Sequence, residues 1–228
     1  MTIYFVDFEA SGLGPLSFPV ELGWAWVEDD HVEARSLLIR PVEEWTANGC
    51  PGWDLVAEAL HGLSLARIEE SGLSPRLAVA EFTSRVEIGE VSFDTGQNGQ
   101  DRKWLERVSS AADVPQELSL RPEATGTMIL SMAEKAGVGD VAWTALECLG
   151  PKATHQAAVD ASRWAWWPIA ISRVSNAGLA GISNLNQCVE LIRPVVGSIE
   201  IRGSTGDLTR LQGQSYGVRV THRDFLPW

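Results

Sequence analysis

The chain has 228 residues, of which 45% are hydrophobic and 21% are charged, and its formal net charge is -12. This length and apolar content supply one sizeable core and exclude an intrinsically disordered chain. The acidic balance also excludes a protein that binds nucleic acid mainly through a broad basic surface, because that mode depends on many lysines and arginines.

The first 40 residues predict an antiparallel meander of three strands. The runs 2–8, 20–27 and 31–39 are rich in β-branched and aromatic residues, which favour strands. The loop at 9–19 contains Gly and Pro, and a turn is expected at Asp29-Asp30. A fourth strand is predicted at 90–94.

Helices are predicted over most of the remaining chain. Their starts are indicated by residues that cap helices, such as Ser74 before Pro75, and their ends by glycines such as Gly137. Pro168 is expected to kink or interrupt the last of them. Because strands come first and helices then alternate with strands, we expect an α/β fold with a mixed sheet flanked by helices. The predicted helices cover 54–60, 64–70, 75–86, 98–110, 125–136 and 155–167.

The composition of the chain changes near residue 181. Residues 181–228 contain four acidic residues and five arginines, so this segment does not share the acidity of the rest. We therefore divide the chain into a main domain, 1–180, and a C-terminal extension, 181–228. Within the extension, Ser198–Arg202 and Gly217–Thr221 are candidates to pair as a β-hairpin.

Asp7 and Glu9 form the first candidate functional cluster. They are two residues apart on a predicted strand, so both side chains project to the same face. Two adjacent carboxylates repel each other, and a bound divalent cation removes that repulsion. Carboxylate oxygens suit Mg²⁺ or Mn²⁺. A solvated strand end is the alternative interpretation of the pair.

Asp101 is the second candidate, in the first turn of a predicted helix. A carboxylate there is also favoured by the helix dipole alone, without any catalytic role. Trp104 and Leu105 follow at positions that can anchor the same helix in the core. Asp94, at the end of the preceding strand, is a rival for the role of Asp101.

His155 and Asp160 form the third cluster. Five residues in an ideal helix correspond to about 500°, so the two side chains converge only if His155 lies at or before the helix start. Asp160 would then lie about one turn into the helix. An imidazole at such a junction suits a general base. A surface histidine that caps a helix is the alternative.

The order of these clusters resembles the DEDDh exonucleases, a superfamily that includes proofreading exonucleases, RNase T and oligoribonuclease. The resemblance covers roughly residues 1–175 and rests on four short motifs. It implies a ribonuclease-H-like fold with a mixed five-stranded sheet flanked by helices, and an exonuclease-like catalytic domain in residues 1–180. The matching segments are Val6–Leu13, Leu60–Leu63, Ser92–Gly96 with Asp101–Leu105, and His155–Ala161.

The resemblance also implies a mechanism and a product. Two Mg²⁺ or Mn²⁺ ions, about 4 Å apart, would be held by Asp7, Glu9, Asp101 and Asp160. One metal would orient a water, His155 would take its proton, and the hydroxide would attack the 3′-terminal phosphate. The second metal would stabilise the leaving 3′-oxygen. The expected activity is 3′→5′ exonucleolytic release of 5′-mononucleotides from single-stranded DNA or RNA ends.

Four further residues are expected to bind substrate on the same grounds. Ser11, Gly12 and Leu13 follow the first carboxylates, and similarity suggests that they hold the terminal nucleotide with Leu13 against its base. His61 is expected to line the pocket. An ordinary loop, for the first three, and a packed or helix-capping histidine, for His61, are the alternatives.

Two other functions remain open from the sequence. The chain could be a non-catalytic ribonuclease-H-like binding module, or a phosphoester hydrolase that acts on small nucleotides. Retention of all five presumed catalytic residues favours the exonuclease, because a binding module does not need a general base beside four carboxylates. The sequence does not distinguish DNA from RNA as the substrate. It also leaves the oligomeric state open, with a homodimer as one alternative.

The cellular compartment is indicated by what the sequence lacks. No apolar run reaches the roughly 18 residues that a spanning helix requires, so no membrane association is expected. The N-terminus has no basic segment before its apolar run and does not resemble a signal peptide. The three cysteines are widely spaced, which argues against a disulfide framework. We therefore expect a cytoplasmic protein.

Overall fold

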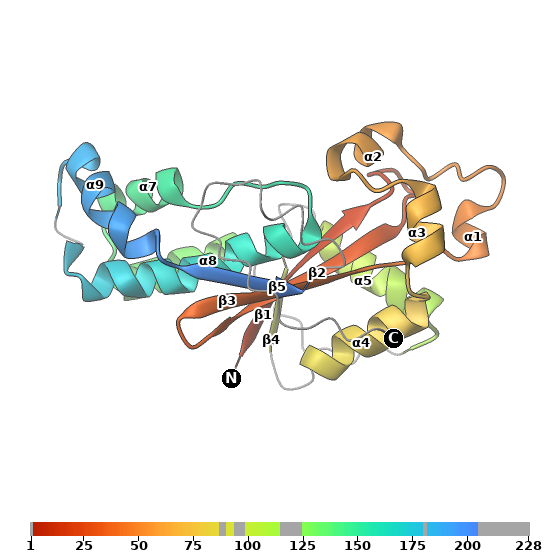
Figure 1. Cartoon of the computed structure of the whole chain (residues 1–228), viewed down its shortest axis with the longest axis horizontal. Helices are drawn as coiled ribbons and strands as arrows, with labels where there is room; N and C mark the ends of the chain where they lie inside the picture. Colours follow the sequence, from red (N-terminus) through yellow and green to blue (C-terminus); the bar gives the residue numbers. More distant parts are fainter. Residues whose placement is uncertain (1, 87–89, 94–98, 115–124, 180–181, 205–228) are drawn as a thin grey trace.

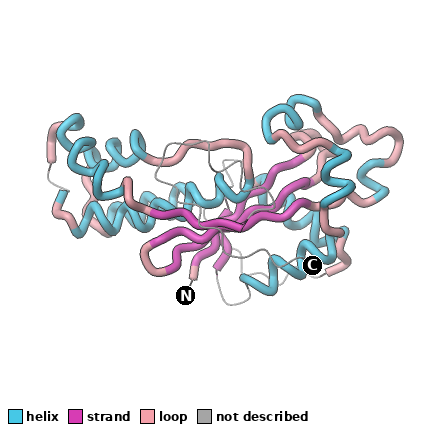
Figure 2. The backbone as a smooth tube through the Cα atoms, in the orientation of Figure 1, coloured by secondary structure: helices cyan, strands magenta, loops and turns pink. Residues whose placement is uncertain are grey.

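The computed structural model describes residues 2–86, 90–93, 99–114, 125–179 and 182–204. A twisted central sheet lies between two groups of helices (Figures 1 and 2). Three antiparallel strands open the chain, as predicted: β1 (Ile3–Ala10), β2 (Pro19–Glu28) and β3 (His31–Leu38). The fourth strand, β4 (Glu90–Phe93), pairs with β1 in parallel, so the sheet is mixed.

The fifth strand of the sheet differs from the prediction. Residues 1–180 contribute four strands in the part of the chain that the structure describes, rather than five. The remaining strand, β5 (Glu200–Ser204), belongs to the C-terminal extension and pairs in parallel with β3, giving the order β4-β1-β2-β3-β5. The proposed hairpin partner, 217–221, lies outside the described residues. The division of the chain at residue 181 stays a prediction.

Helices cover both faces of the sheet. The segment between β3 and β4 forms four helices, and the segment between β4 and β5 forms five in the described residues. Figure 1 shows α8 lying along one face, whereas α4 and α5 lie on the other. The helices are α1 (Glu43–Thr46), α2 (Leu55–His61), α3 (Leu65–Ser71), α4 (Pro75–Val86), α5 (Gln100–Ala111), α6 (Thr125–Lys135), α7 (Asp140–Leu149), α8 (Ala157–Asn176) and α9 (Leu185–Val196).

The alternation of side chains on β1 and β2 divides the core in two. Val6, Leu22 and Trp24 pack against α4 and α5, whereas Phe5 and Ala25 pack beneath α8. Because side chains alternate along a strand, the odd-numbered residues of both strands face α8. This places Asp7 and Glu9 on the α8 face of the sheet.

Of the two predicted effects of Pro168, a kink or an interruption of the last helix, the interruption does not occur. Helix α8 runs through Pro168 for another eight residues to Asn176. A proline removes one backbone hydrogen bond and costs about 3 kcal/mol in a helix interior. Burial of the apolar residues that follow, including Ile169, Ala170 and Val174, offsets this cost.

Candidate active site

Asp7 and Glu9 lie at the end of β1 and are almost fully enclosed. Each is 9% exposed. Their neighbours Val6 and Phe8 point into the opposite core, which fixes the strand and therefore the direction of both carboxylates. The solvated strand end considered above does not describe them, because a solvated carboxylate would be far more exposed.

Asp160 reaches the same place from the start of α8. The residue is 5% exposed and lies in the first turn of the helix, which begins at Ala157. One carboxylate oxygen accepts the backbone N–H of Thr154 at 2.8 Å, and the other accepts that of His155 at 2.9 Å. Asp160 therefore holds the loop that precedes its own helix, and the loop fixes the orientation of the carboxylate.

Asp7, Glu9 and Asp160 form one cluster. A carboxylate oxygen from each lies within 4.8 Å of the other two. Burial, followed by the charges of Asp160, Glu21 and Asp101, raises the pKa of Glu9 to about 9. Burial also raises the pKa of Asp160, and the hydrogen bonds from Thr154 and His155 oppose that rise.

This donor set fits a hard divalent cation. Buried carboxylates at such separations are costly when ionised and unpaired. A cation with oxygen preference, such as Mg²⁺ or Mn²⁺, would restore the ionised form of Glu9 and offset the repulsion. The raised pKa of Glu9 reflects burial and nearby negative charge, both of which a bound cation would counter.

Asp101 is near this cluster but is not one of the three residues whose oxygens lie within 4.8 Å of one another. It is 6% exposed in the first turn of α5, and its charge contributes to the raised pKa of Glu9. Trp104 and Leu105 are buried and anchor the helix, as predicted. The helix begins after Gly99, which has a left-handed φ of 56°. The rival candidate Asp94 lies outside the described residues.

His155 lies immediately before α8, as the five-residue spacing requires. Its φ of 57° is in the left-handed region, its side chain is exposed, and its backbone N–H is held by Asp160. Histidine adopts this conformation more readily than most residues. His155 is also among the groups that oppose the rise in the pKa of Asp160.

Glu21 is a further carboxylate at this site that the sequence reasoning missed. It pairs with Glu9 across β1 and β2, and its charge raises the pKa of Glu9. Its Oε2 also accepts the backbone N–H of Ala157, the first residue of α8, at 3.3 Å. The position of Glu21 between Val20 and Leu22 in a predicted strand was the signal that could have identified it. Its partner on β1, however, depends on the register of the sheet.

Gly23 allows the start of α8 to approach the sheet. It pairs with Asp7 on β1, and a Cβ at this position would overlap the backbone of Ala157 and Ala158. The absence of a side chain here therefore sets the height of α8 above the strands. Because Asp160 is one turn further along α8, Gly23 also sets the separation between Asp160 and the β1 carboxylates.

Replacing Gly23 with Ala is expected to lift the start of α8 and to weaken cation binding. Overpacking of this kind costs about 1–3 kcal/mol of stability, and displacement of Asp160 should reduce Mn²⁺ affinity about tenfold or more. Titration calorimetry with Mn²⁺ and thermal unfolding measure the two effects. The control is Gly126→Ala in α6, where a Cβ would meet nothing within 4 Å. Equal Mn²⁺ affinity in the two variants would contradict the role of Gly23.

The predicted substrate contacts fall into different environments. Ser11 is fully buried; its Oγ donates to the Gly52 carbonyl at 2.8 Å and accepts the Phe18 N–H at 2.9 Å. Gly12 is also buried, and a Cβ there would lie 2.9 Å from Ser17 Oγ. Leu13, in contrast, is 86% exposed. The structure thus brings Leu13 to the surface, while Ser11 and Gly12 build the loop beneath it.

His61 lies at the end of α2 and is 4% exposed. Its Nδ1 accepts the backbone N–H of Leu63 at 3.0 Å, and its ring meets Trp53 edge-on with centroids 6.5 Å apart. His61 is therefore a packed histidine whose ring accepts a backbone N–H just after the end of α2. Its role, and that of the other three residues, in binding substrate stays a prediction.

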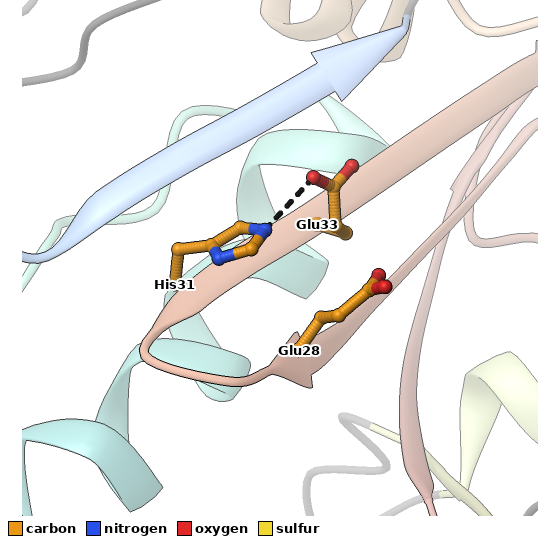
Figure 3. Close-up of side chains that lie close together, drawn as sticks. All are labelled: Glu28, His31 and Glu33. Carbon is orange, nitrogen blue, oxygen red and sulfur yellow. Dashed lines mark hydrogen bonds and ion pairs between the residues drawn. The ribbon is translucent and has the colours of Figure 1, made fainter.

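A second acidic group lies at the other end of the β2–β3 hairpin. Glu28, His31 and Glu33 gather there (Figure 3), and His31 Nε2 lies 3.0 Å from Glu33 Oε1. Arg202 of β5 lies 3.2 Å from the same His31 nitrogen and donates to Glu200 at 2.7 Å. The arginine already supplies a positive charge to this group, which joins β5 to β3.

Among the described residues, every helix is too short or too polar to cross a lipid bilayer.

Comparisons with known proteins support the fold. No family model matches the chain, and no curated protein matches it. Among solved structures, Escherichia coli exonuclease I with a dA16 oligonucleotide matches at a TM-score of 0.53 and 11% identity, over 83% of this chain and 42% of that one. The apo form matches at 0.52 and 13%, over 83% and 46%. The zinc-bound form of its single-stranded DNA complex matches at 0.52 and 13%, over 77% and 40%.

This similarity shows that the chain shares the fold of exonuclease I. The chain spans less than half the length of exonuclease I. The protein therefore has a ribonuclease-H-like fold, and most of its chain corresponds to part of Escherichia coli exonuclease I.

Proposed function

We propose that this protein is a metal-dependent 3′→5′ exonuclease that releases 5′-mononucleotides from single-stranded DNA or RNA ends. The observation that carries the proposal is the buried cluster of Asp7, Glu9 and Asp160, whose oxygens lie within 4.8 Å of one another. The exonuclease I structures with single-stranded DNA and with zinc support the same chemistry on this fold.

The four carboxylates of the proposal would hold two Mg²⁺ or Mn²⁺ ions. Asp7 and Glu9 contribute from β1, Asp101 from α5 and Asp160 from α8. When bound, the ions supply charge neutralisation at the phosphate and make a bound water more acidic. Four negative charges balanced by four positive ones also explain how an acidic chain can receive a phosphodiester.

His155 is the proposed general base. Its imidazole takes a proton from the attacking water as the water oxygen bonds to phosphorus and the bond from phosphorus to the 3′-oxygen breaks. The released 3′-oxygen takes up a proton from solvent and becomes the new 3′-hydroxyl of the shortened strand, and the other product is a 5′-mononucleotide. The loop position of His155, held by Asp160 through one hydrogen bond, leaves the ring exposed to an arriving strand end.

The proposal is tested with 5′-end-labelled single-stranded DNA and RNA, in Mn²⁺ and in EDTA. Stepwise shortening from the 3′ end is expected in Mn²⁺ and not in EDTA. A protein that takes up Mn²⁺ but shortens neither strand would act as a binding module, and one that cleaves only small nucleotide esters would be a different phosphoester hydrolase. Either result would contradict the exonuclease.

Replacing His155 with Ala is expected to lower kcat about 10²- to 10⁴-fold, the usual range for a general base. His155→Asn should lose as much activity, although asparagine tolerates the left-handed backbone. Mn²⁺ affinity should stay within about threefold of the wild type, because the imidazole is not a proposed ligand. Added imidazole should restore part of the activity of His155→Ala. Loss of Mn²⁺ binding without rescue would show a structural role instead.

A further inference from the structure

Helix α8 begins without a cap from the residue that precedes it. Gln156 makes no side-chain hydrogen bond to the first turn of the helix. In contrast, Asp54, Ser64 and Asn184 each accept a backbone N–H at the start of α2, α3 and α9. The first N–H groups of a helix have no partner within the helix, so the start of α8 needs an acceptor from elsewhere.

The start of α8 is buried, which limits access of water to these N–H groups. Ala157 and Ala158, the first two residues of the helix, are 0% and 2% exposed. A buried N–H group without a partner costs free energy comparable to a lost hydrogen bond. The acceptor for the Ala157 N–H comes from β2, where Glu21 Oε2 lies 3.3 Å from the nitrogen. A side chain 136 residues away in the chain therefore caps α8.

The face of β2 beneath α8 suits this contact. Glu21, Gly23 and Ala25 alternate along the strand and therefore lie on the same face. Gly23 lets the backbone of Ala157 come close to the strand, and Ala25 is small and fully buried. Glu21 adds a hydrogen-bond acceptor where the helix starts. Its negative charge also suits the positive end of the helix dipole.

Two carboxylates from different elements hold the junction before α8. Asp160, in the first turn of the helix, accepts the backbone N–H groups of Thr154 and His155 at 2.8 and 2.9 Å. Glu21 accepts the N–H of Ala157, two residues beyond His155. Asp160 belongs to α8 and fixes the junction only relative to that helix. Glu21 belongs to β2, so its hydrogen bond fixes both the junction and the helix relative to the sheet.

Glu21 is next to the β1 carboxylates but is not part of their closest group. It pairs with Glu9 across the two strands. In the part of the chain that the structure describes, the three carboxylates whose oxygens lie within 4.8 Å of one another are Asp7, Glu9 and Asp160. The hydrogen bond from Glu21 therefore connects the strands at the level of Glu9 to the helix that carries Asp160.

We propose that Glu21 is a positioning residue that caps α8 from β2 and so keeps Asp160 within reach of Asp7 and Glu9. Its consequence for catalysis rests on the proposed nuclease function, whereas the cap itself does not. Loss of the cap would let the start of α8 move away from the sheet, together with the junction that carries His155. Cation affinity and kcat should then fall together. KM for a strand should change little, because Glu21 acts through α8.

The test compares Glu21→Gln with Glu21→Met. Both variants remove the charge of Glu21 and have side chains of similar length, but only glutamine keeps an oxygen that can accept the Ala157 N–H. Titration calorimetry should show that Glu21→Met binds Mn²⁺ about tenfold more weakly than Glu21→Gln, the usual cost of losing a residue that supports a ligand. With saturating Mn²⁺, kcat for a thymidine octamer should be about tenfold lower in Glu21→Met, with KM within about twofold.

Asn184→Ala is the matched control. It removes a helix cap at a distance from the carboxylates, where Asn184 Oδ1 accepts the Gln187 N–H at 3.0 Å at the start of α9. It should lower the unfolding temperature by about 2–4 °C, the shift expected for one cap in a chain of this size. Glu21→Met should unfold lower than Glu21→Gln by a similar amount. Asn184→Ala should keep wild-type Mn²⁺ affinity and kcat, because α9 carries none of the proposed ligands.

Equal Mn²⁺ affinity in Glu21→Gln and Glu21→Met would overturn the inference. An equal and large loss in both variants would indicate that Glu21 binds the cation directly, since a ligand needs its negative charge and a cap needs only an oxygen. Loss of Mn²⁺ affinity in Asn184→Ala as well would also overturn it, because the effect would then follow from lower stability alone.

Failure of the nuclease proposal gives a different result. If the wild type binds Mn²⁺ without shortening a strand, the exonuclease proposal fails, and the difference in Mn²⁺ affinity between the two Glu21 variants still tests the cap. If the wild type binds no Mn²⁺, hydrogen–deuterium exchange of residues 154–160 tests the cap in the metal-free protein. Exchange about tenfold faster in Glu21→Met than in Glu21→Gln would support the cap, and equal exchange would overturn it.

Discussion

Asp160→Asn is expected to abolish Mn²⁺-dependent shortening of single-stranded substrates, with kcat lower by about 10³-fold or more. The substitution removes a proposed cation ligand. It also places an amide NH₂ group where the carboxylate now accepts the N–H groups of Thr154 and His155. One of those two hydrogen bonds must be lost, because two donors would face each other. The loop that carries His155 would therefore loosen as well.

The measurement is single-turnover hydrolysis of a labelled oligonucleotide, together with an Mn²⁺ titration. Asp140→Asn is the matched control, since Asp140 is also an acidic residue in the first turn of a helix but is exposed. The control should keep the activity and Mn²⁺ affinity of the wild type. Activity in Asp160→Asn above a tenth of the wild-type value would remove Asp160 from the proposed metal site.

Glu9→Gln is expected to make the metal-free protein more stable while it removes activity. Burial and the charges of Asp160, Glu21 and Asp101 raise the pKa of Glu9 to about 9, from an ordinary value of 4.5. Between these values the folded protein keeps the proton and the unfolded chain has lost it. The free energy of unfolding therefore falls as pH rises through this window, and it does not change further above the folded pKa.

Glutamine carries no charge, so the variant should not show this loss. At pH 8 and without metal, we expect Glu9→Gln to unfold several degrees higher than the wild type, for a gain on the order of 2 kcal/mol. Mn²⁺ at about 100 times its Kd should add roughly 2.7 kcal/mol to the wild type and much less to the variant. The wild type should therefore become the more stable protein, or nearly equal, once Mn²⁺ is present.

Thermal unfolding at pH 5 and pH 8, with EDTA and with Mn²⁺, measures these differences. Glu134→Gln is the control, because Glu134 is exposed on α6. It should not change the pH dependence or the Mn²⁺ response. A metal-free Glu9→Gln protein that is less stable than the wild type at pH 8 would show that the carboxylates are not in conflict, and the metal proposal would lose its physical basis.

Local patterns in the sequence predicted most of the elements that carry the site. The strand at the N-terminus, the helix after Ser74 and the start of the helix near Ala157 all follow from residues that lie within a few positions of each boundary. Helices α7 and α9 were not predicted. Their apolar residues pack against α8 and each other, and this burial depends on neighbours far away in the chain.

The continuation of α8 through Pro168 shows the same limit. The local cost of a proline is visible in the sequence, but the burial that offsets it depends on the helices and strands around α8. Similarly, β5 joins the sheet beside β3, a pairing that the sequence did not predict. The sequence pattern of a strand does not depend on which edge of the sheet the strand joins, since backbone hydrogen bonding does not require a particular partner.

The sequence by itself determined which carboxylates could cooperate. Asp7 and Glu9 share a face because side chains alternate along a strand, and Asp160 lies one turn into its helix because His155 precedes the helix start. The tertiary structure alone decided how close they come. The antiparallel register brought Glu21 opposite Glu9, and Gly23 allowed α8 to descend onto the sheet. The distance between α8 and the sheet depends on packing between segments more than a hundred residues apart, which no local pattern encodes.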